Sequence, residues 1–296
     1  MGKVSKSLLI GVPFVLIYFI IRNLPVEPCD FLHEETYNEE GVLDYCGPGD
    51  SDFVDLTTRK WPLKLKFRPL DDLKTGRDIR FEIDLRQFDG SPLKAEDIAL
   101  SHTKKIHLLA VHQSLSDYQH IHPEPDSLYD GIWKFSMTPK YSGKYSVFLD
   151  FIPIRSPRRV ILSTSFNVIG NETHEQRMQT STYKLEGSSF KLGYDKSEDG
   201  DNLELTLSVT DDQNKSQILE PVMGAFAHMV AFDEKLKGFA HLHPNENTTP
   251  IAKDASHTGV LTFTFVPPSK GRFRLWAQCK LAQNKNEIFV PFDIEI

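Results

Sequence analysis

The feature that most constrains the fold is a histidine pattern that occurs twice with the same spacing. It consists of one histidine, a second thirteen residues later, a third two residues after that, and then a proline. The two sets are His107, His120, His122 and Pro123, and His228, His241, His243 and Pro244. Each member of the second set follows its counterpart by 121 residues, in a chain with 11 histidines. His112 is not repeated, because Asp233 stands at its matching position. The repetition indicates a duplicated domain.

Hydrophobic and polar residues alternate with period two around both patterns, which is typical of half-buried strands. In the first copy we expect strands at 63–67, 79–85, 106–111, 117–122, 132–137, 144–151 and 160–168. In the second copy we expect them at 188–194, 203–209, 227–232, 239–243, 260–266, 272–281 and 287–296. About seven short strands per copy predict an all-β protein of two tandem antiparallel immunoglobulin-like β-sandwiches. The predicted repeats are 61–169 and 183–296, joined by a polar linker at 170–182.

The N-terminus indicates a membrane anchor. Lys3 and Lys6 precede an uncharged run at 7–21, and Arg22 ends it. We expect residues 1–23 to form an uncleaved signal anchor, a single transmembrane helix with its N-terminus in the cytoplasm. The alternative is a cleaved signal peptide, since the run is short for a membrane span. The domains that follow this helix are therefore expected to be extracytoplasmic.

The three cysteines fit an extracytoplasmic chain. Cys29 and Cys46 flank a short acidic segment in a predicted stalk at 24–60, where a disulfide can form. Two free thiols or a metal-binding pair are the alternatives. Cys279 has the spacing of a core residue on a strand and is expected to be a buried, unreactive thiol.

Each histidine pattern is expected to lie on a hairpin. If the first hairpin turns at Ser114 and Leu115, His107 faces His122, and His120 lies on the same face of the sheet. The equivalent register in the second copy brings His228, His241 and His243 together. Three imidazoles suit zinc or copper and leave a position open for another ligand. The candidate additional ligands are His102, Asp150, Met223 and Gln278.

Two other interpretations remain. The histidines could be buried residues of a polar network in a structural or partner-binding module, because Leu109 and Val111 share their strand face with His107. An open three-histidine site could also activate water, but we see no general base or substrate pocket beside it. A blue-copper site needs a cysteine with a histidine just downstream and an axial ligand, usually methionine. Cys279 cannot begin such a site, because no His follows His257 and no Met follows Met229. The net charge of −7 argues against a nucleic-acid partner.

The two patterns also carry a resemblance. The first copy contains HTKKIHLLAV, SDYQHIHPE and TPKYSGKYSVFLDF, and the second contains GAFAHMVAF, GFAHLHP and PPSKGRFRLWAQ. These motifs resemble those of uncharacterised bacterial envelope proteins with YtkA-like or FixH-like immunoglobulin-type repeats, over about 61–296. The resemblance implies a β-sandwich fold, a suspected role in metal handling and an envelope location. With the predicted anchor, that location is the bacterial inner membrane, with the C-terminal domains in the periplasm. His102 and Lys104 have no equivalents in the second copy.

Together these observations predict a membrane-anchored extracytoplasmic binding protein without catalytic residues. It would bind copper or zinc through one histidine triad in each repeat. An envelope protein is the candidate partner.

Overall fold

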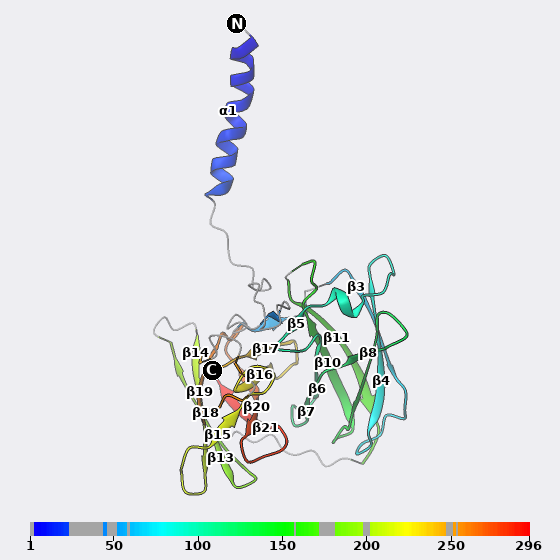
Figure 1. Cartoon of the computed structure of the whole chain (residues 1–296), viewed down its shortest axis with the longest axis vertical. Helices are drawn as coiled ribbons and strands as arrows, with labels where there is room; N and C mark the ends of the chain where they lie inside the picture. Colours follow the sequence, from blue (N-terminus) through cyan, green and yellow to red (C-terminus); the bar gives the residue numbers. More distant parts are fainter. Residues whose placement is uncertain are drawn as a thin grey trace. The chain divides into compact units, whose positions relative to one another are not determined.

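The computed structural model describes residues 3–23, 44–45, 52–57, 60–156, 158–171, 181–197, 202–246, 251–252 and 254–296. Its N-terminal unit contains one helix, α1 (Lys3–Arg22), which exposes apolar side chains from Val12 to Ile21 (Figure 1). Within the described residues, no helix has both the length and the hydropathy needed to span a membrane. Cys29 and Cys46 lie outside the described residues, so the disulfide stays a prediction.

Repeat 1 comprises strands β3 to β11, and all of these except β5 form two four-stranded sheets (Figure 1). One sheet has the order β3-β4-β9-β8 and the other has the order β11-β10-β6-β7. Its strands are β3 (Leu63–Pro69), β4 (Ile79–Gln87), β5 (Leu100–Ser101), β6 (His107–His112), β7 (Tyr118–Ile121), β8 (Glu124–Pro125), β9 (Ile132–Met137), β10 (Gly143–Phe151) and β11 (Val160–Val168). β5 pairs with β1 (Asp44–Tyr45), and a short 3-10 helix, η1 (Ala95–Asp97), precedes β5.

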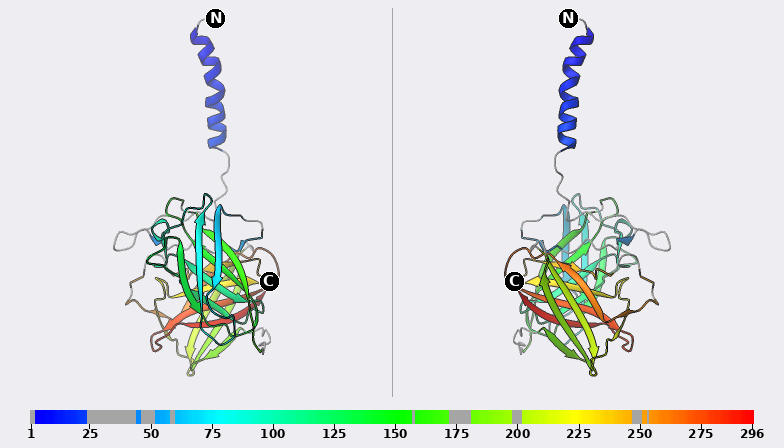
Figure 2. Two further views of the ribbon diagram at one scale, coloured as in Figure 1. Left: turned by 90° about the vertical axis from the view of Figure 1, so that its right-hand side faces the viewer. Right: turned by 90° about the vertical axis from the view of Figure 1, so that its left-hand side faces the viewer.

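Repeat 2 comprises strands β12 to β21 and has a similar plan (Figure 2). One sheet has the order β12-β13-β14-β19, and the other has the order β18-β15-β20-β16-β17-β2 with β21 also paired to β20. The strands are β12 (Thr182–Leu185), β13 (Ser188–Lys196), β14 (Leu203–Asp211), β15 (Ile218–Glu220), β16 (Ala227–Asp233), β17 (Gly238–Leu242), β18 (His257–Thr258), β19 (Val260–Phe265), β20 (Arg272–Leu281) and β21 (Ile288–Glu295). The chain is thus an all-β, sandwich-like protein with a repeated plan, as the alternation predicts.

Each repeat has its own hydrophobic core between its two sheets. Leu108 and Ala110 of β6 lie in the core of repeat 1, and Met229 and Ala231 of β16 lie in that of repeat 2. Successive side chains of a strand point to opposite faces of the sheet. The alternate residues therefore lie on the face opposite their own core: His107, Leu109 and Val111 in β6, and His228, Val230 and Phe232 in β16.

That opposite face is covered by the other repeat. A third apolar cluster joins the two repeats through Leu109, Val111, Leu115, Tyr118, Phe148 and Ile161 of repeat 1 and Val230, Phe232, Phe239 and Trp276 of repeat 2. The Arg274 guanidinium donates a hydrogen bond to the Leu115 carbonyl at 3.2 Å across this interface. All six residues of β6 are buried, because the strand has a core on one face and the partner repeat on the other.

Part of the predicted stalk belongs to repeat 2. Strand β2 (Val54–Asp55) extends its sheet by pairing with β17, and Val54 is buried. The β2 backbone comes so close to Gly238 that a Cβ on that glycine would lie 1.7 Å from the Val54 carbonyl oxygen. A glycine in a strand commonly marks such a close approach.

We therefore expect Gly238→Ala to displace β2 and to lower the free energy of unfolding by about 1–3 kcal/mol, the usual range for overpacking. Urea unfolding measures the loss, and hydrogen exchange at Val54 reports the displacement. The matched control is Gly193→Ala in β13, where an added Cβ meets no atom within 4 Å. Equal stabilities of the two variants would contradict this prediction.

Candidate metal centre

Both hairpins have the predicted register. Leu109 pairs with His120 in the first hairpin, and Val230 pairs with His241 in the second. On the other side of each first strand, His107 pairs with Asp150 and His228 pairs with Gln278. The duplication is therefore preserved in the hydrogen-bonding pattern as well as in the sequence.

A proline places the last histidine of each triad. His122 and His243 lie just beyond the final strand residues, Ile121 and Leu242. A residue that precedes proline is sterically confined to extended backbone. His122 therefore continues the alternation of its strand and shares a face with His120, although it has no strand partner.

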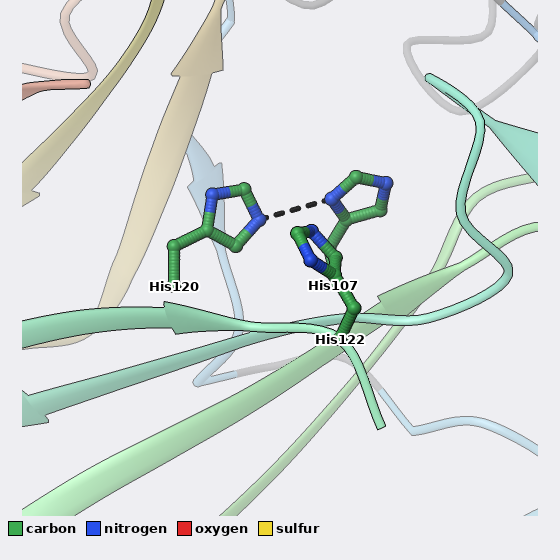
Figure 3. A group of neighbouring side chains, drawn as sticks. All are labelled: His107, His120 and His122. Atoms are coloured by element: carbon green, nitrogen blue, oxygen red, sulfur yellow. Dashed lines mark hydrogen bonds between the residues drawn. The ribbon is translucent and has the colours of Figure 1, made fainter. Parts of the chain in front are cut away.

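The first triad converges as Figure 3 shows. The ring centroids of His107, His120 and His122 lie 5.2, 5.0 and 4.8 Å apart, and one nitrogen from each ring lies within 4.8 Å of the others. In a tetrahedral zinc site with Zn–N bonds of about 2.0–2.1 Å, imidazole centres lie about 5 Å apart. The triad therefore has the dimensions of a metal site.

The second triad has almost the same dimensions and is more deeply buried. The ring centroids of His228, His241 and His243 lie 5.4, 5.0 and 4.9 Å apart. His228 and His241 are 0% and 1% exposed, whereas His120 in the first triad is 9% exposed. Each of the two triads could hold a metal ion.

A backbone carbonyl orients the first histidine of each triad. His107 Nε2 lies 2.8 Å from the Ser101 oxygen, and His228 Nε2 lies 2.9 Å from the Val222 oxygen. A carbonyl oxygen only accepts hydrogen bonds, so Nε2 carries the proton in both rings. Nδ1 of each neutral ring therefore bears a lone pair, the arrangement that metal-binding histidines commonly show.

Gln278 orients His120 from the other repeat. The Gln278 amide nitrogen donates to a Glu287 carboxylate oxygen at 2.6 Å, so its Oε1 accepts from His120 Nδ1 at 2.7 Å. His120 Nε2 then bears a lone pair and lies 2.9 Å from His107 Nδ1, the contact drawn in Figure 3. In neutral rings, two lone pairs face each other at hydrogen-bond distance. A cation between these nitrogens would stabilise the arrangement.

Burial makes a proton a poor candidate for that cation. Desolvation, followed by the nearby His107, lowers the pKa of His120 to about 3. Desolvation also lowers the pKa of His122 to about 2, assisted by His107, His120 and Lys104. The pKa values of His228 and His241 are well below the usual value for the same principal reason. These rings are neutral near pH 7, as metal binding requires.

The two triads lie side by side at the interface between the repeats. His120 is 5.5 Å from His241 and 6.4 Å from His228, measured between ring centroids. His102 joins them, with its ring centroid 4.0 Å from that of His243 and 6.2 Å from that of His107. The candidate ligand His102 of repeat 1 therefore lies beside the triad of repeat 2.

The other candidate ligands differ in their placement. Both Asp150 oxygens accept hydrogen bonds from Arg159 in a buried ion pair, so this carboxylate is engaged in a salt bridge. Gln278 orients His120. Met223 is half-buried and occupies the turn of repeat 2 that corresponds to the His102 turn.

The unrepeated histidine has a structural role. His112 is buried, donates from Nε2 to the Ser142 carbonyl and accepts at Nδ1 from the Ser114 hydroxyl. Its counterpart Asp233 accepts from the Lys235 and Lys237 amides in the following turn. Cys279 is fully buried, which raises the pKa of its thiol to about 12 and confirms the predicted core thiol.

Sequence reasoning missed the groups that orient the ligands. The carbonyls of Ser101 and Val222 belong to the backbone, which a side-chain pattern does not reveal. Glu287 acts on the site through Gln278, which bonds to His120. Only the equal six-residue spacing of Ser101 and Val222 before the first histidines was readable in advance.

Comparison with protein families places the chain in one family. The model described as "Domain of unknown function (DUF8832)" matches residues 63–164 and 182–296. The chain belongs to this family. The two matched segments of the DUF8832 chain contain all six triad histidines, His102 and Gln278. No curated protein matches, and the YtkA-like and FixH-like resemblance stays a prediction.

Solved structures overlap with the DUF8832 chain only weakly. A Parabacteroides merdae β-glucuronidase is 9% identical, with 77% of this chain and 24% of that chain covered and a TM-score of 0.21. Fibronectin(III)-like modules of Clostridium thermocellum CbhA are 11% identical, with 78% and 94% covered and a TM-score of 0.21. A Corynebacterium diphtheriae protein described as membrane anchored is 10% identical, with 78% and 58% covered and a TM-score of 0.23. The chain spans about a quarter of the glucuronidase, and overlaps this weak carry no information about function.

The low pKa of His120 predicts a pH-dependent stability in the metal-free protein. The unfolded chain takes up a proton at this residue below about pH 6.5, whereas the native ring stays neutral down to about pH 3. The free energy of unfolding should therefore decrease as the pH is lowered through this window, by up to about 1.4 kcal/mol per pH unit for each such histidine.

Urea unfolding of chelator-treated protein between about pH 7 and pH 5 measures this slope. His120→Gln removes the proton acceptor and should make the slope shallower. An unchanged slope would show that His120 is protonated in the native state.

Proposed function

We propose that this protein binds transition-metal ions, copper or zinc, one at each histidine triad. The proposal includes its assignment as a membrane-anchored extracytoplasmic binding protein rather than an enzyme. The candidate ligands are His107, His120 and His122 for the first ion and His228, His241 and His243 for the second.

The observation that carries the proposal is the contact between His107 Nδ1 and His120 Nε2. The outer nitrogen of each ring donates its proton to an oxygen, and the inner nitrogens face each other at 2.9 Å. The orienting groups thus turn two lone pairs toward one point. Nitrogens of the remaining ligands support it: His122 Nε2, His228 Nδ1 and His241 Nε2 are buried and have no hydrogen-bond partner among the described residues.

The donor set supports copper or zinc over harder cations. Neutral imidazole suits zinc and copper, whereas magnesium and calcium prefer oxygen ligands. Three histidines around one ion leave a position open for water or an incoming group. Such a site suits the capture and transfer of metal ions, with an envelope protein as the proposed partner.

A second candidate function is a structural module in which the histidines hold the repeats together. The hydrogen bond from His120 to Gln278 favours it, because it crosses the interface without any metal. The two functions differ in a simple respect: only the first requires a metal ion.

The location rests on the N-terminal segment. Helix α1 has exposed apolar side chains from Val12 to Ile21. In the sequence, Lys3 and Lys6 precede the uncharged run and Arg22 ends it, as in a signal anchor. We propose an uncleaved anchor with both repeats outside the cytoplasm. The facing sheets of each repeat support the immunoglobulin-like assignment and the envelope-protein resemblance that accompanies it.

Metal titration of the full chain tests the central claim. Calorimetry with zinc and with copper should give about two ions per chain, which corresponds to one ion per triad. The double substitution His120→Ala and His122→Ala should remove one of the two. His257→Gln is the control, since His257 lies in β18 outside both triads. A wild-type chain with no binding tighter than about millimolar would support the structural module instead.

Reporter fusions test the location. Alkaline phosphatase joined to the C-terminus should be active in a bacterial host, because its disulfides form only outside the cytoplasm. The same fusion without residues 1–23 is the control and should be inactive. Release of the full-length chain from membranes by alkaline carbonate would argue against an uncleaved anchor.

A further inference from the structure

The duplication is broken at one position that lies close to the histidines. Tight turns bridged at Ser101 and Lys104 in repeat 1 and at Val222 and Ala225 in repeat 2 precede the two first histidines. Their second residues are His102 and Met223, and both have φ of 49°. The backbone is thus the same in both turns, while the side chains differ in chemistry.

The His102 ring lies against the triad of the other repeat. Its centroid is 4.0 Å from that of His243, 5.6 Å from that of His228 and 6.3 Å from that of His241. Ligand rings around one tetrahedral ion have centres about 5 Å apart. The three distances bracket that value, so the His102 ring lies within the range expected of a fourth ligand ring.

We propose that His102 of repeat 1 is the fourth ligand of the metal ion held by His228, His241 and His243 of repeat 2. This inference rests on the proposed metal-binding function and gives its two sites different properties. The second site has four histidines and no open position, as in structural zinc sites. The first site keeps its open position.

Burial agrees with this division. His102, His228, His241 and His243 are all buried, whereas His122 of the first triad is partly exposed. A closed site with ligands from both repeats would hold the interface together when the ion is bound. The ion in the first site would exchange with solvent or with a partner. One ion is thus structural and the other is the cargo.

The test isolates the second site. In a full-length chain carrying His120→Ala and His122→Ala, one ion should remain bound. Adding His102→Asn removes the fourth ligand, and Asn tolerates the positive φ of this turn. We expect zinc affinity to fall by about 100-fold or more, beyond the 10–100-fold loss typical of outer partners.

The number of imidazole ligands on the metal ion distinguishes a ligand from a residue with only a structural role. X-ray absorption of the zinc-loaded protein should count four imidazoles in the single-site background and three after His102→Asn. With cobalt(II), the intense visible bands of a tetrahedral site should weaken as water enters. His257→Gln in the same background is the control, because His257 lies in β18 outside both triads and its substitution should leave the bound ion unchanged. Thermal unfolding of the metal-free variants checks that each still folds.

The outcomes separate the two proposals. If the single-site protein binds zinc with the same affinity and imidazole count with and without His102, this inference is overturned while the proposed function stands. If the wild-type chain binds neither zinc nor copper, the proposed function fails and the inference fails with it.

Discussion

The structure depends on the burial of two strands on both of their faces. β6 and β16 each contribute alternate side chains to the core of their own repeat and to the interface between the repeats. His107 of β6 and His228 of β16 occupy the interface side of this alternation. Burial at the interface lowers the pKa values of four triad histidines through desolvation and so keeps those rings neutral. Burial of the strands on both faces thus produces the neutral imidazoles that metal binding requires.

At the interface, each repeat also supplies a side chain that contacts the triad of the other repeat. Gln278 of repeat 2 orients His120 of repeat 1, and His102 of repeat 1 lies beside His243 of repeat 2. Asp150, the counterpart of Gln278, lines a cavity of about 10 Å³ together with His241 of the other repeat. Each triad is therefore in contact with a side chain of the opposite repeat.

Two buried ion pairs lie at this interface. Arg159 binds Asp150 and also lies over the Phe239 ring of the other repeat, 5.6 Å from its centroid. Arg274 binds Asp293 and donates to the Leu115 carbonyl across the interface. A buried charge without a partner is costly, so these pairs favour one relative placement of the facing sheets.

The sequence by itself determined the β fold, the duplication and the register of both hairpins, because alternation and turn position are local properties of a strand pair. Those local rules also brought each triad together, as Leu109 opposite His120 illustrates. Only the tertiary structure decided that the two triads share one interface, that β2 joins repeat 2 and that His102 lies with the distant triad. These outcomes depend on which sheet faces pack together, and packing between repeats leaves no periodic signal in either one. The orienting carbonyls were equally hidden, since every residue carries one and only the fold selects which are used.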